Sequence, residues 1–135
     1  MKSFVLAGML VLSSTLPVLA KPVYPTEKQF WMYEFKLATF FSNSEMAKRN
    51  GAYLRKSDSQ RRKDGQLACG LMNDSSVAAY IAGELKIIES SYGNNPKRET
   101  DETAYLLGVT IAAIDSMCSE NRAELIDLLD RLEER

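Results

Sequence analysis

The sequence predicts an all-α fold, a small four- to five-helix bundle closed by one disulfide bond. Apolar residues recur at helical spacing in successive segments, and no segment shows sustained alternation of polar and apolar residues. The chain also contains two cysteines. Its 135 residues are 45% hydrophobic and 26% charged, which is typical of one globular domain and argues against wholesale disorder.

The first expected helix spans about residues 26–41 and is the most aromatic part of the chain. Thr26 and Gln29 have the spacing of a capping box, which marks a helix start. We expect one apolar stripe that packs on the core, with a hydrophobic binding surface as the alternative. The stripe comprises Phe30, Tyr33, Leu37, Phe40 and Phe41, widened by Trp31 and Phe35.

Residues 42–57 carry the weakest structural signal. They contain few apolar residues, and Asn50-Gly51 favours a turn, although a short helix over about residues 45–54 is the alternative. Ser57 and Gln60 repeat the capping-box spacing, so a second helix should run from there to about residue 73.

A third helix is expected after the Asp74-Ser75 cap. It should end at residues 92–96, because Gly93 permits a positive φ and Pro96 lacks a backbone donor. Its inward residues are expected to be Val77, Ile81, Leu85 and Ile88, broadened by Tyr80 and Ile87.

A fourth helix is expected to begin at Thr100 or Asp101 and to end near Cys118. A fifth should follow from Ser119. The inner face of the fourth comprises Ala104, Leu107, Ile111, Ile114 and Cys118, and the stripe of the fifth comprises Leu125, Leu128, Leu129 and Leu132.

Residues 1–20 have the pattern of a secretory signal peptide. Lys2 supplies a positive start, an apolar run follows, and small residues at Val18 and Ala20 predict cleavage before Lys21. An uncleaved membrane helix is the alternative, which the serines, Thr15 and Pro17 of this segment weaken. The sequence therefore predicts a secreted or periplasmic protein with no transmembrane segment after signal removal.

The mature chain should form one globular unit with two parts. Residues 21–56 would supply the aromatic helix and a basic linker, and residues 57–135 would form a disulfide-closed helical domain.

Cys69 and Cys118 are expected to form an internal disulfide bond. An even cysteine count in an oxidising compartment favours pairing, and neither residue belongs to a C-x-x-C motif. An intermolecular bridge and a redox-active thiol are the alternatives.

Two segments, residues 64–72 and 101–118, together resemble a family of small exported two-cysteine proteins catalogued as domain of unknown function 732. The matching residues are Gly65, Cys69, Ala104, Gly108, Ala113 and Cys118, whereas Asn73, Met117 and Ser119 depart from the family pattern. The resemblance implies a helical fold closed by a disulfide, and it implies no activity. A weaker resemblance, to periplasmic acid-resistance chaperones of the HdeA type, rests on the segment around Cys118.

Seven basic residues lie close together in residues 48–63 and are the candidate partner-binding residues. The partner would be an unknown protein or an anionic surface of the cell envelope, and nucleic acid is not expected for an exported chain. A solvated face that pairs with the acidic C-terminal segment is the alternative. The residues are Lys48, Arg49, Arg55, Lys56, Arg61, Arg62 and Lys63.

Five acidic residues recur at helical spacing near the C-terminus: Glu120, Glu124, Asp127, Asp130 and Glu134. We expect them to form an exposed face. A weak Ca²⁺ site is the alternative, although the segment lacks an EF-hand pattern.

The sequence predicts no enzyme, no catalytic residues, no cofactor and no metal. The absence of histidine excludes His-dependent triads and most zinc sites. Glu84 and Asp115 lie close to apolar helix faces, and burial would raise the pKa of either carboxyl group. A catalytic role would need a concave polar pocket around one of them.

These observations together predict a monomeric or weakly associating, non-catalytic binding module at the cell envelope. The alternative is a periplasmic acid- or stress-responsive chaperone. In that case low pH would loosen the fold and expose the aromatic residues of the first helix.

Overall fold

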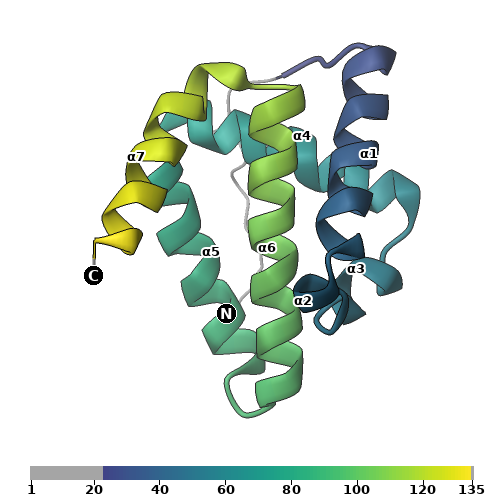
Figure 1. The fold of residues 1–135 in the computed structure, drawn as a ribbon, viewed down its shortest axis with the longest axis vertical. Coiled ribbons are helices and arrows are strands. Elements are labelled where there is room, and N and C mark those ends of the chain that lie inside the picture. Colours follow the sequence, from purple (N-terminus) through teal and green to yellow (C-terminus); the bar gives the residue numbers. More distant parts are fainter. Residues whose placement is uncertain (1–22, 135) are drawn as a thin grey trace.

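The computed structural model describes residues 23–134, and the expected signal peptide lies outside them (Figure 1). Within this range the chain is helical and contains no β-strand, so the all-α prediction is confirmed. Five helices have 12 or more residues. The elements are α1 (Glu27–Ser42), α2 (Ser44–Ala47), α3 (Gly51–Arg55), α4 (Asp58–Asp74), α5 (Val77–Tyr92), α6 (Pro96–Ser116), the 3₁₀ turn η2 (Ser119–Asn121) and α7 (Arg122–Glu133).

Helix α6 forms the centre of the fold. Helices α1, α3, α4 and α5 all pack against it, and Figure 1 shows α1 on one side of α6 and α5 with α7 on the other. Eleven of its 21 residues are buried, so this helix contacts the core over more than one face. Because α6 meets neighbours on several sides, its apolar residues do not form a single stripe.

Two glycines allow α1 to approach the central helices closely. A Cβ atom at Gly65 of α4 would lie 2.5 Å from the ring of Tyr33 on α1. At Gly108 of α6 it would lie 2.9 Å from the ring of Phe40. Tyr33 and Leu37 are almost completely buried there, so the aromatic helix packs on the core partly because these two positions lack side chains.

The disulfide bond joins the C-terminal half of α4 to the end of α6. The sulfur atoms of Cys69 and Cys118 are 2.08 Å apart, and their Cα atoms are 5.7 Å apart. Both cysteines are fully buried. The internal pairing predicted from the sequence is therefore confirmed.

The two predicted capping boxes have different outcomes. At Thr26 both halves are present, because its hydroxyl accepts from Gln29 N and the Gln29 side chain accepts from Thr26 N. Ser57 accepts from Gln60 N in the same way. The Gln60 amide, however, donates to Asp64, so the second capping box is only half formed.

The fourth long helix begins earlier than the sequence predicted. Helix α6 begins at Pro96, with the Asn95 side chain accepting from Arg98 N. Proline fits a first helical turn because its φ is fixed and its missing donor has no acceptor there. Gly93 has φ −60°, so the expected positive φ is wrong. Pro96 does not only end the third helix; it also starts the next one after a short turn.

Residues 43–56 form two short helices in place of one short helix or a simple turn. Asn43 caps α2 through its side-chain oxygen, which accepts from Glu45 N. Helix α3 starts at Gly51, where the backbone approaches the buried carboxylate of Asp101. The segment lacks a long apolar stripe, so these helices depend on packing against α1 and α6.

Reducing the disulfide should lower the free energy of unfolding by about 4 kcal/mol, because the bond closes a long loop in the unfolded chain. Urea denaturation with and without a reductant would measure this difference. The paired variant Cys69→Ala/Cys118→Ala should behave like the reduced protein. An unchanged transition midpoint in both would contradict this account.

The glycine packing predicts opposite effects at two helical positions. Gly65→Ala should destabilise the fold by about 1–3 kcal/mol, because the new methyl group would overlap the Tyr33 ring. Gly83→Ala on α5 should stabilise it by up to about 1 kcal/mol, because a Cβ there meets no atom within 4 Å. Thermal denaturation would compare them, and equal effects would contradict close packing at Gly65.

Candidate functional site

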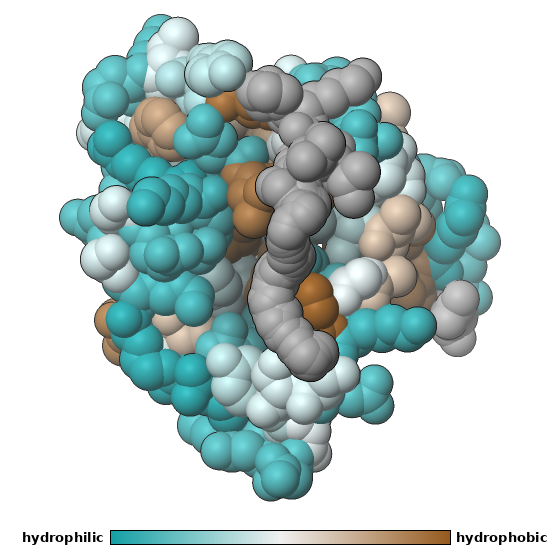
Figure 2. All heavy atoms as spheres, turned by 180° about the vertical axis from the view of Figure 1, so that it is seen from behind, coloured by the Kyte–Doolittle hydropathy of each residue, from teal (hydrophilic) through white to brown (hydrophobic). Residues whose placement is uncertain are grey.

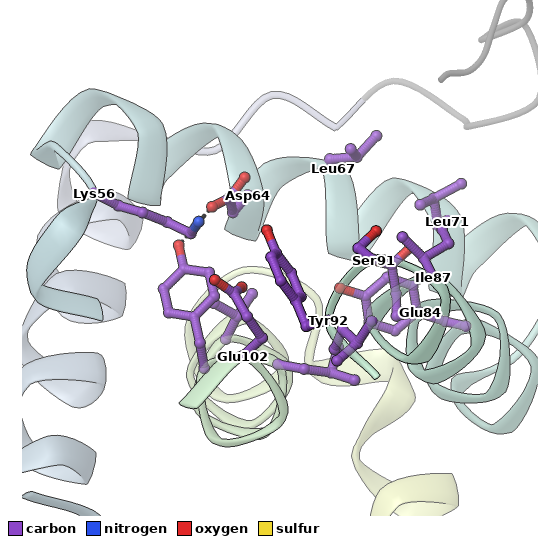
Figure 3. Close-up of a pocket in the computed structure, with 14 residues that line it drawn as sticks. Lys56, Asp64, Leu67, Leu71, Glu84, Ile87, Ser91, Tyr92 and Glu102 are labelled. Atoms are coloured by element: carbon purple, nitrogen blue, oxygen red, sulfur yellow. Dashed lines mark hydrogen bonds between the residues drawn. The ribbon is translucent and has the colours of Figure 1, made fainter. Parts of the chain in front are cut away.

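A cavity of about 230 Å³ lies between α4, α5 and α6 (Figure 3). Figure 3 shows Lys56, Asp64 and Glu102 toward one end of it, with Leu71 and Ile87 toward the other. Its polar lining comprises Lys56, Asp64, Tyr80, Glu84, Ser91, Tyr92, Glu102 and Tyr105, and its apolar lining comprises Leu67, Leu71, Ile87, Ile88, Leu106 and Val109.

Helical spacing places these side chains on three facing surfaces. On α5, Tyr80, Glu84 and Ile88 are separated by four residues each, so they share one face. On α6, Glu102 and Tyr105 are three residues apart. The sequence had placed Leu85 on the inner face of α5, but Leu85 is 41% exposed. The helix is rotated so that polar residues face α4 and α6.

Asp64 is held by two hydrogen bonds at the polar end. The hydroxyl of Tyr105 donates to Asp64 Oδ2 over 2.5 Å, and Gln60 Nε2 donates to Asp64 Oδ1 over 2.8 Å. Burial nevertheless raises the pKa of the Asp64 carboxyl group. Burial, together with the charge of Asp64, also raises the pKa of Tyr105 far above its ordinary value, so this phenol stays protonated and acts as a donor.

Glu84 differs from Asp64 because it has no hydrogen bond or ion pair with any residue from 23 to 134. Burial raises its pKa to about 7, and the negative charge of Asp64 adds to the effect. This carboxyl group therefore titrates close to neutral pH, well above the ordinary value of 4.5. It is an acid in a partly apolar cavity, and no cation of residues 23–134 forms an ion pair with it.

The cations around the cavity already have partners. Arg98 Nε donates to Glu102 Oε2 over 3.2 Å, and the guanidinium carbon of Arg98 lies 4.5 Å from the ring centre of Tyr92. Lys56 Nζ lies 4.9 Å from the ring centre of Tyr105. These are cation–π distances, so two tyrosine rings of the cavity each have a cation from the chain.

Comparison with models of known protein families gives no match, and comparisons with curated proteins and with solved structures give none either. Between residues 23 and 134, no helix combines the length and the apolar character that a membrane crossing requires. The same range holds no cluster of three or more cysteine or carboxylate side chains suited to a metal ion.

Six of the seven basic candidate residues have partners within the described chain. Arg62 forms ion pairs with Glu34 and Glu27, over 2.7 Å and 3.1 Å. The partners of the others come from α2, α4 and α6, and one of them, Glu102, belongs to the acidic part of the chain that follows residue 98. They are Lys48 and Arg49 with Glu45, Arg55 with Glu102, Arg61 with Asp58, and Lys56 with the Tyr105 ring, while Lys63 is exposed.

One member of the acidic stripe has a structural role that the sequence did not reveal. Glu124 of α7 accepts from Val77 N over 2.9 Å and from Ala78 N over 3.0 Å. It therefore caps the first turn of α5 from another helix, where a negative charge is favourable. The prediction of one uniformly exposed acidic face is wrong at this residue.

The two carboxylates singled out in the sequence have different locations. Glu84 lines the cavity. Asp115 instead forms ion pairs with Lys36 over 3.8 Å and with Arg122 over 3.5 Å, outside the cavity lining. The sequence analysis did not single out Asp64, Glu102 and Tyr105, and it placed Tyr80 only on the apolar inner face of α5. Their signal as a site is no more than polar residues three or four apart within helices.

The aromatic residues of α1 divide between two faces. Tyr33, Leu37 and Phe41 are buried. Trp31 and Phe35 were expected to widen this stripe, but they are 62% and 58% exposed, and their rings stack with centres 5.8 Å apart. The buried residues and the exposed Trp31–Phe35 pair lie on different faces, so α1 has one apolar face in the core and a second one toward solvent.

Glu84 should make the protein less stable as the pH rises. The folded state holds this proton up to about pH 7, whereas an unfolded chain releases it near the ordinary value of 4.5. The stabilisation is full below pH 4.5 and is lost as the pH rises through 7. Between pH 5 and pH 8, Glu84 alone should lower the free energy of unfolding by on the order of 2 kcal/mol.

Urea titrations at pH 5 and pH 8 would test this with two variants. Glu84→Gln should remove most of the decrease, and Asp64 should account for what remains. Glu89→Gln, at an exposed glutamate of the same helix, should leave the decrease unchanged. If the free energy of unfolding decreases equally between pH 5 and pH 8 in the unmodified protein and in both variants, Glu84 does not hold a buried proton.

Proposed function

We propose that this chain is an exported, non-catalytic binding module and that the cavity between α4, α5 and α6 is its binding site. One observation carries the proposal: the carboxyl group of Glu84 lines a cavity without a partner from the described chain, beside tyrosine rings and apolar side chains. Small-molecule sites combine these features, namely an apolar wall and a few polar groups that fix orientation.

The chemistry around the cavity supports binding more than catalysis. Both cysteines are joined in the disulfide, so neither is available as a nucleophile. Asp64 already accepts two hydrogen bonds, and Glu102 is paired with Arg98 and Arg55. No nucleophile with an adjacent base lines the cavity.

Export, a monomeric state and closure of the helices into a small bundle belong to the same proposal. The signal pattern of residues 1–20 and the buried disulfide are what an exported protein would have. The resemblance to domain of unknown function 732 also stays a proposal. The two glycines that carry this resemblance, Gly65 and Gly108, lie where α1 packs closely, so helix packing alone also explains them.

The basic residues of 48–63 contribute less to binding in this proposal than the sequence suggested. A protein partner or an anionic envelope surface would have to compete with the internal ion pairs of Arg55, Arg61 and Arg62. Lys63 is exposed and free of an ion pair within residues 23–134, and one lysine alone is a weak anchor.

The alternative, an acid-responsive chaperone, is less well supported. The chaperone hypothesis predicts that the aromatic residues of α1 become exposed only at low pH. Trp31 and Phe35, however, are already exposed in this structure. The raised pKa values of Glu84 and Asp64 also mean that mild acidification stabilises the junction of α4, α5 and α6.

A fragment library with cationic, neutral and anionic members would test the binding site. In ¹H–¹⁵N NMR spectra of the oxidised protein, binding fragments should shift resonances of residues that line the cavity. Ser91→Trp, at an exposed lining residue, should fill the opening and lower the affinity of these fragments about tenfold or more.

The matched control is Ser90→Trp, at the adjacent exposed residue outside the lining. It should bind the fragments as the unmodified protein does. Fragments that bind elsewhere, that bind Ser91→Trp unchanged, or that do not bind at all would overturn the proposed site.

A further inference from the structure

Three tyrosines line the cavity, and they differ in one respect. Arg98 lies over the ring of Tyr92 and Lys56 lies over the ring of Tyr105. Tyr80 has no cation from the described chain over its ring. It lies one helical turn before Glu84 on the same face of α5, so the ring and the carboxyl group are adjacent.

The charges around Glu84 favour a cation and disfavour an anion at this position. Of the groups that line the cavity, Asp64 and Glu102 are carboxylates, and Tyr80, Tyr92 and Tyr105 are phenols. Among the described residues, Lys56 is the single cation of the lining, and it lies at the end with Asp64 and Glu102 (Figure 3). The end of the cavity that holds Glu84 therefore contains a carboxyl group without a counter-charge from residues 23–134.

The remaining walls determine what kind of cation fits. Leu71, Ile87 and Leu67 line the same cavity, so part of the ligand should be apolar. A cavity of about 230 Å³ is smaller than the roughly 300–1,000 Å³ of drug-sized sites, so the ligand should be small. A hydrated Ca²⁺ ion is a poor fit, because it takes six to eight oxygen ligands and not an aromatic wall.

We propose that the cavity binds a small organic cation, a primary ammonium group with a short apolar tail, between Glu84 and the ring of Tyr80. This inference rests on the proposed function and names its ligand class. The ammonium group would form a charge-assisted hydrogen bond with the Glu84 carboxylate and a cation–π contact with Tyr80. The tail would lie against Leu71 and Ile87.

Binding should be linked to the protonation of Glu84. The cation binds the ionised carboxylate, so a protein whose Glu84 is protonated must first release that proton. The pKa of Glu84 is raised to about 7, so affinity should increase from pH 5.5 to pH 8. At pH 7, binding should release about half a proton per cation.

The test titrates the oxidised protein with n-butylammonium ions and follows ¹H–¹⁵N NMR shifts. 1-Butanol and butyrate, which share the tail but not the positive charge, are the comparison probes. Butylammonium should shift residues that line the cavity, and its affinity should exceed that of both probes by about tenfold or more.

Two pairs of variants separate the ligand contacts from general structural effects. Glu84→Gln should lower butylammonium affinity about tenfold or more and remove most of its pH dependence, whereas Glu89→Gln should change neither. Tyr80→Phe keeps the ring and should retain affinity, whereas Tyr80→Leu should lower it about threefold to tenfold. The spectra themselves show whether each variant is folded.

The outcomes distinguish this inference from the proposed function. If butanol or butyrate binds the cavity as well as butylammonium does, the cation preference is wrong and the binding site stands. If Glu84→Gln binds butylammonium normally, the assigned contact is wrong. If butylammonium and the fragment library both leave the cavity residues unshifted, both proposals fail.

Discussion

Two links between α4 and α6 determine the rest of the structure. One is covalent, from Cys69 of α4 to Cys118, two residues after the end of α6. The other is the hydrogen bond from Tyr105 to Asp64, which lies five residues before Cys69 on α4. With both in place, α4 is held along α6 at two separate points. Helix α5 follows α4 in the chain, after the half of α4 that carries Cys69. The cavity lies between these helices and α6, and the hydrogen-bonded Asp64 and Tyr105 both line it.

Helix α1 depends on the same pair of helices. Its buried ring, Tyr33, packs where Gly65 of α4 has no side chain, and its hydroxyl donates to Arg61 O over 2.6 Å. Phe40 and Phe41 contact α6 around Gly108. A shift of α4 relative to α6 would therefore move both contact surfaces of α1 at once. Loss of packing at one glycine should be felt over much of the core.

The sequence predicted the parts of this structure that arise from local patterns. The helix starts at Thr26 and Ser57 follow from side chains that accept backbone hydrogen bonds three residues later. The cysteine pairing followed from an even cysteine count and from the expectation of export. Pro96 was misread, because a proline both ends one helix and suits the first turn of the next.

The cavity could be predicted only in part, because it depends on how three helices are rotated relative to one another. Glu84 was recognised as a carboxylate near an apolar face, and it lines the cavity. Asp115 had the same sequence pattern but lies among surface cations. Nothing in the sequence shows that Asp64 and Tyr105, 41 residues apart, meet across two helices.

The surface carries hydrophobic side chains that the core does not use. Figure 2 shows one face of the molecule, on which hydrophobic groups come to the surface among mostly hydrophilic ones.

The charged residues of the described chain carry less free charge than the sequence pattern suggests. Five of the seven basic residues in 48–63 form ion pairs, and Arg55 and Arg62 pair with carboxylates of other helices, so their effective charge toward solution is lower than a count suggests.

Trp31, the single tryptophan of the chain, lies stacked on Phe35 at the solvent-facing side of α1. Its indole ring is in contact with water while the protein is folded, so its emission wavelength should change little when the core unfolds. A shift of that emission to shorter wavelength in the native protein would instead signal that another molecule covers α1. The chain thus carries an intrinsic fluorescent probe that reports contacts at its surface and is nearly silent about its own folding.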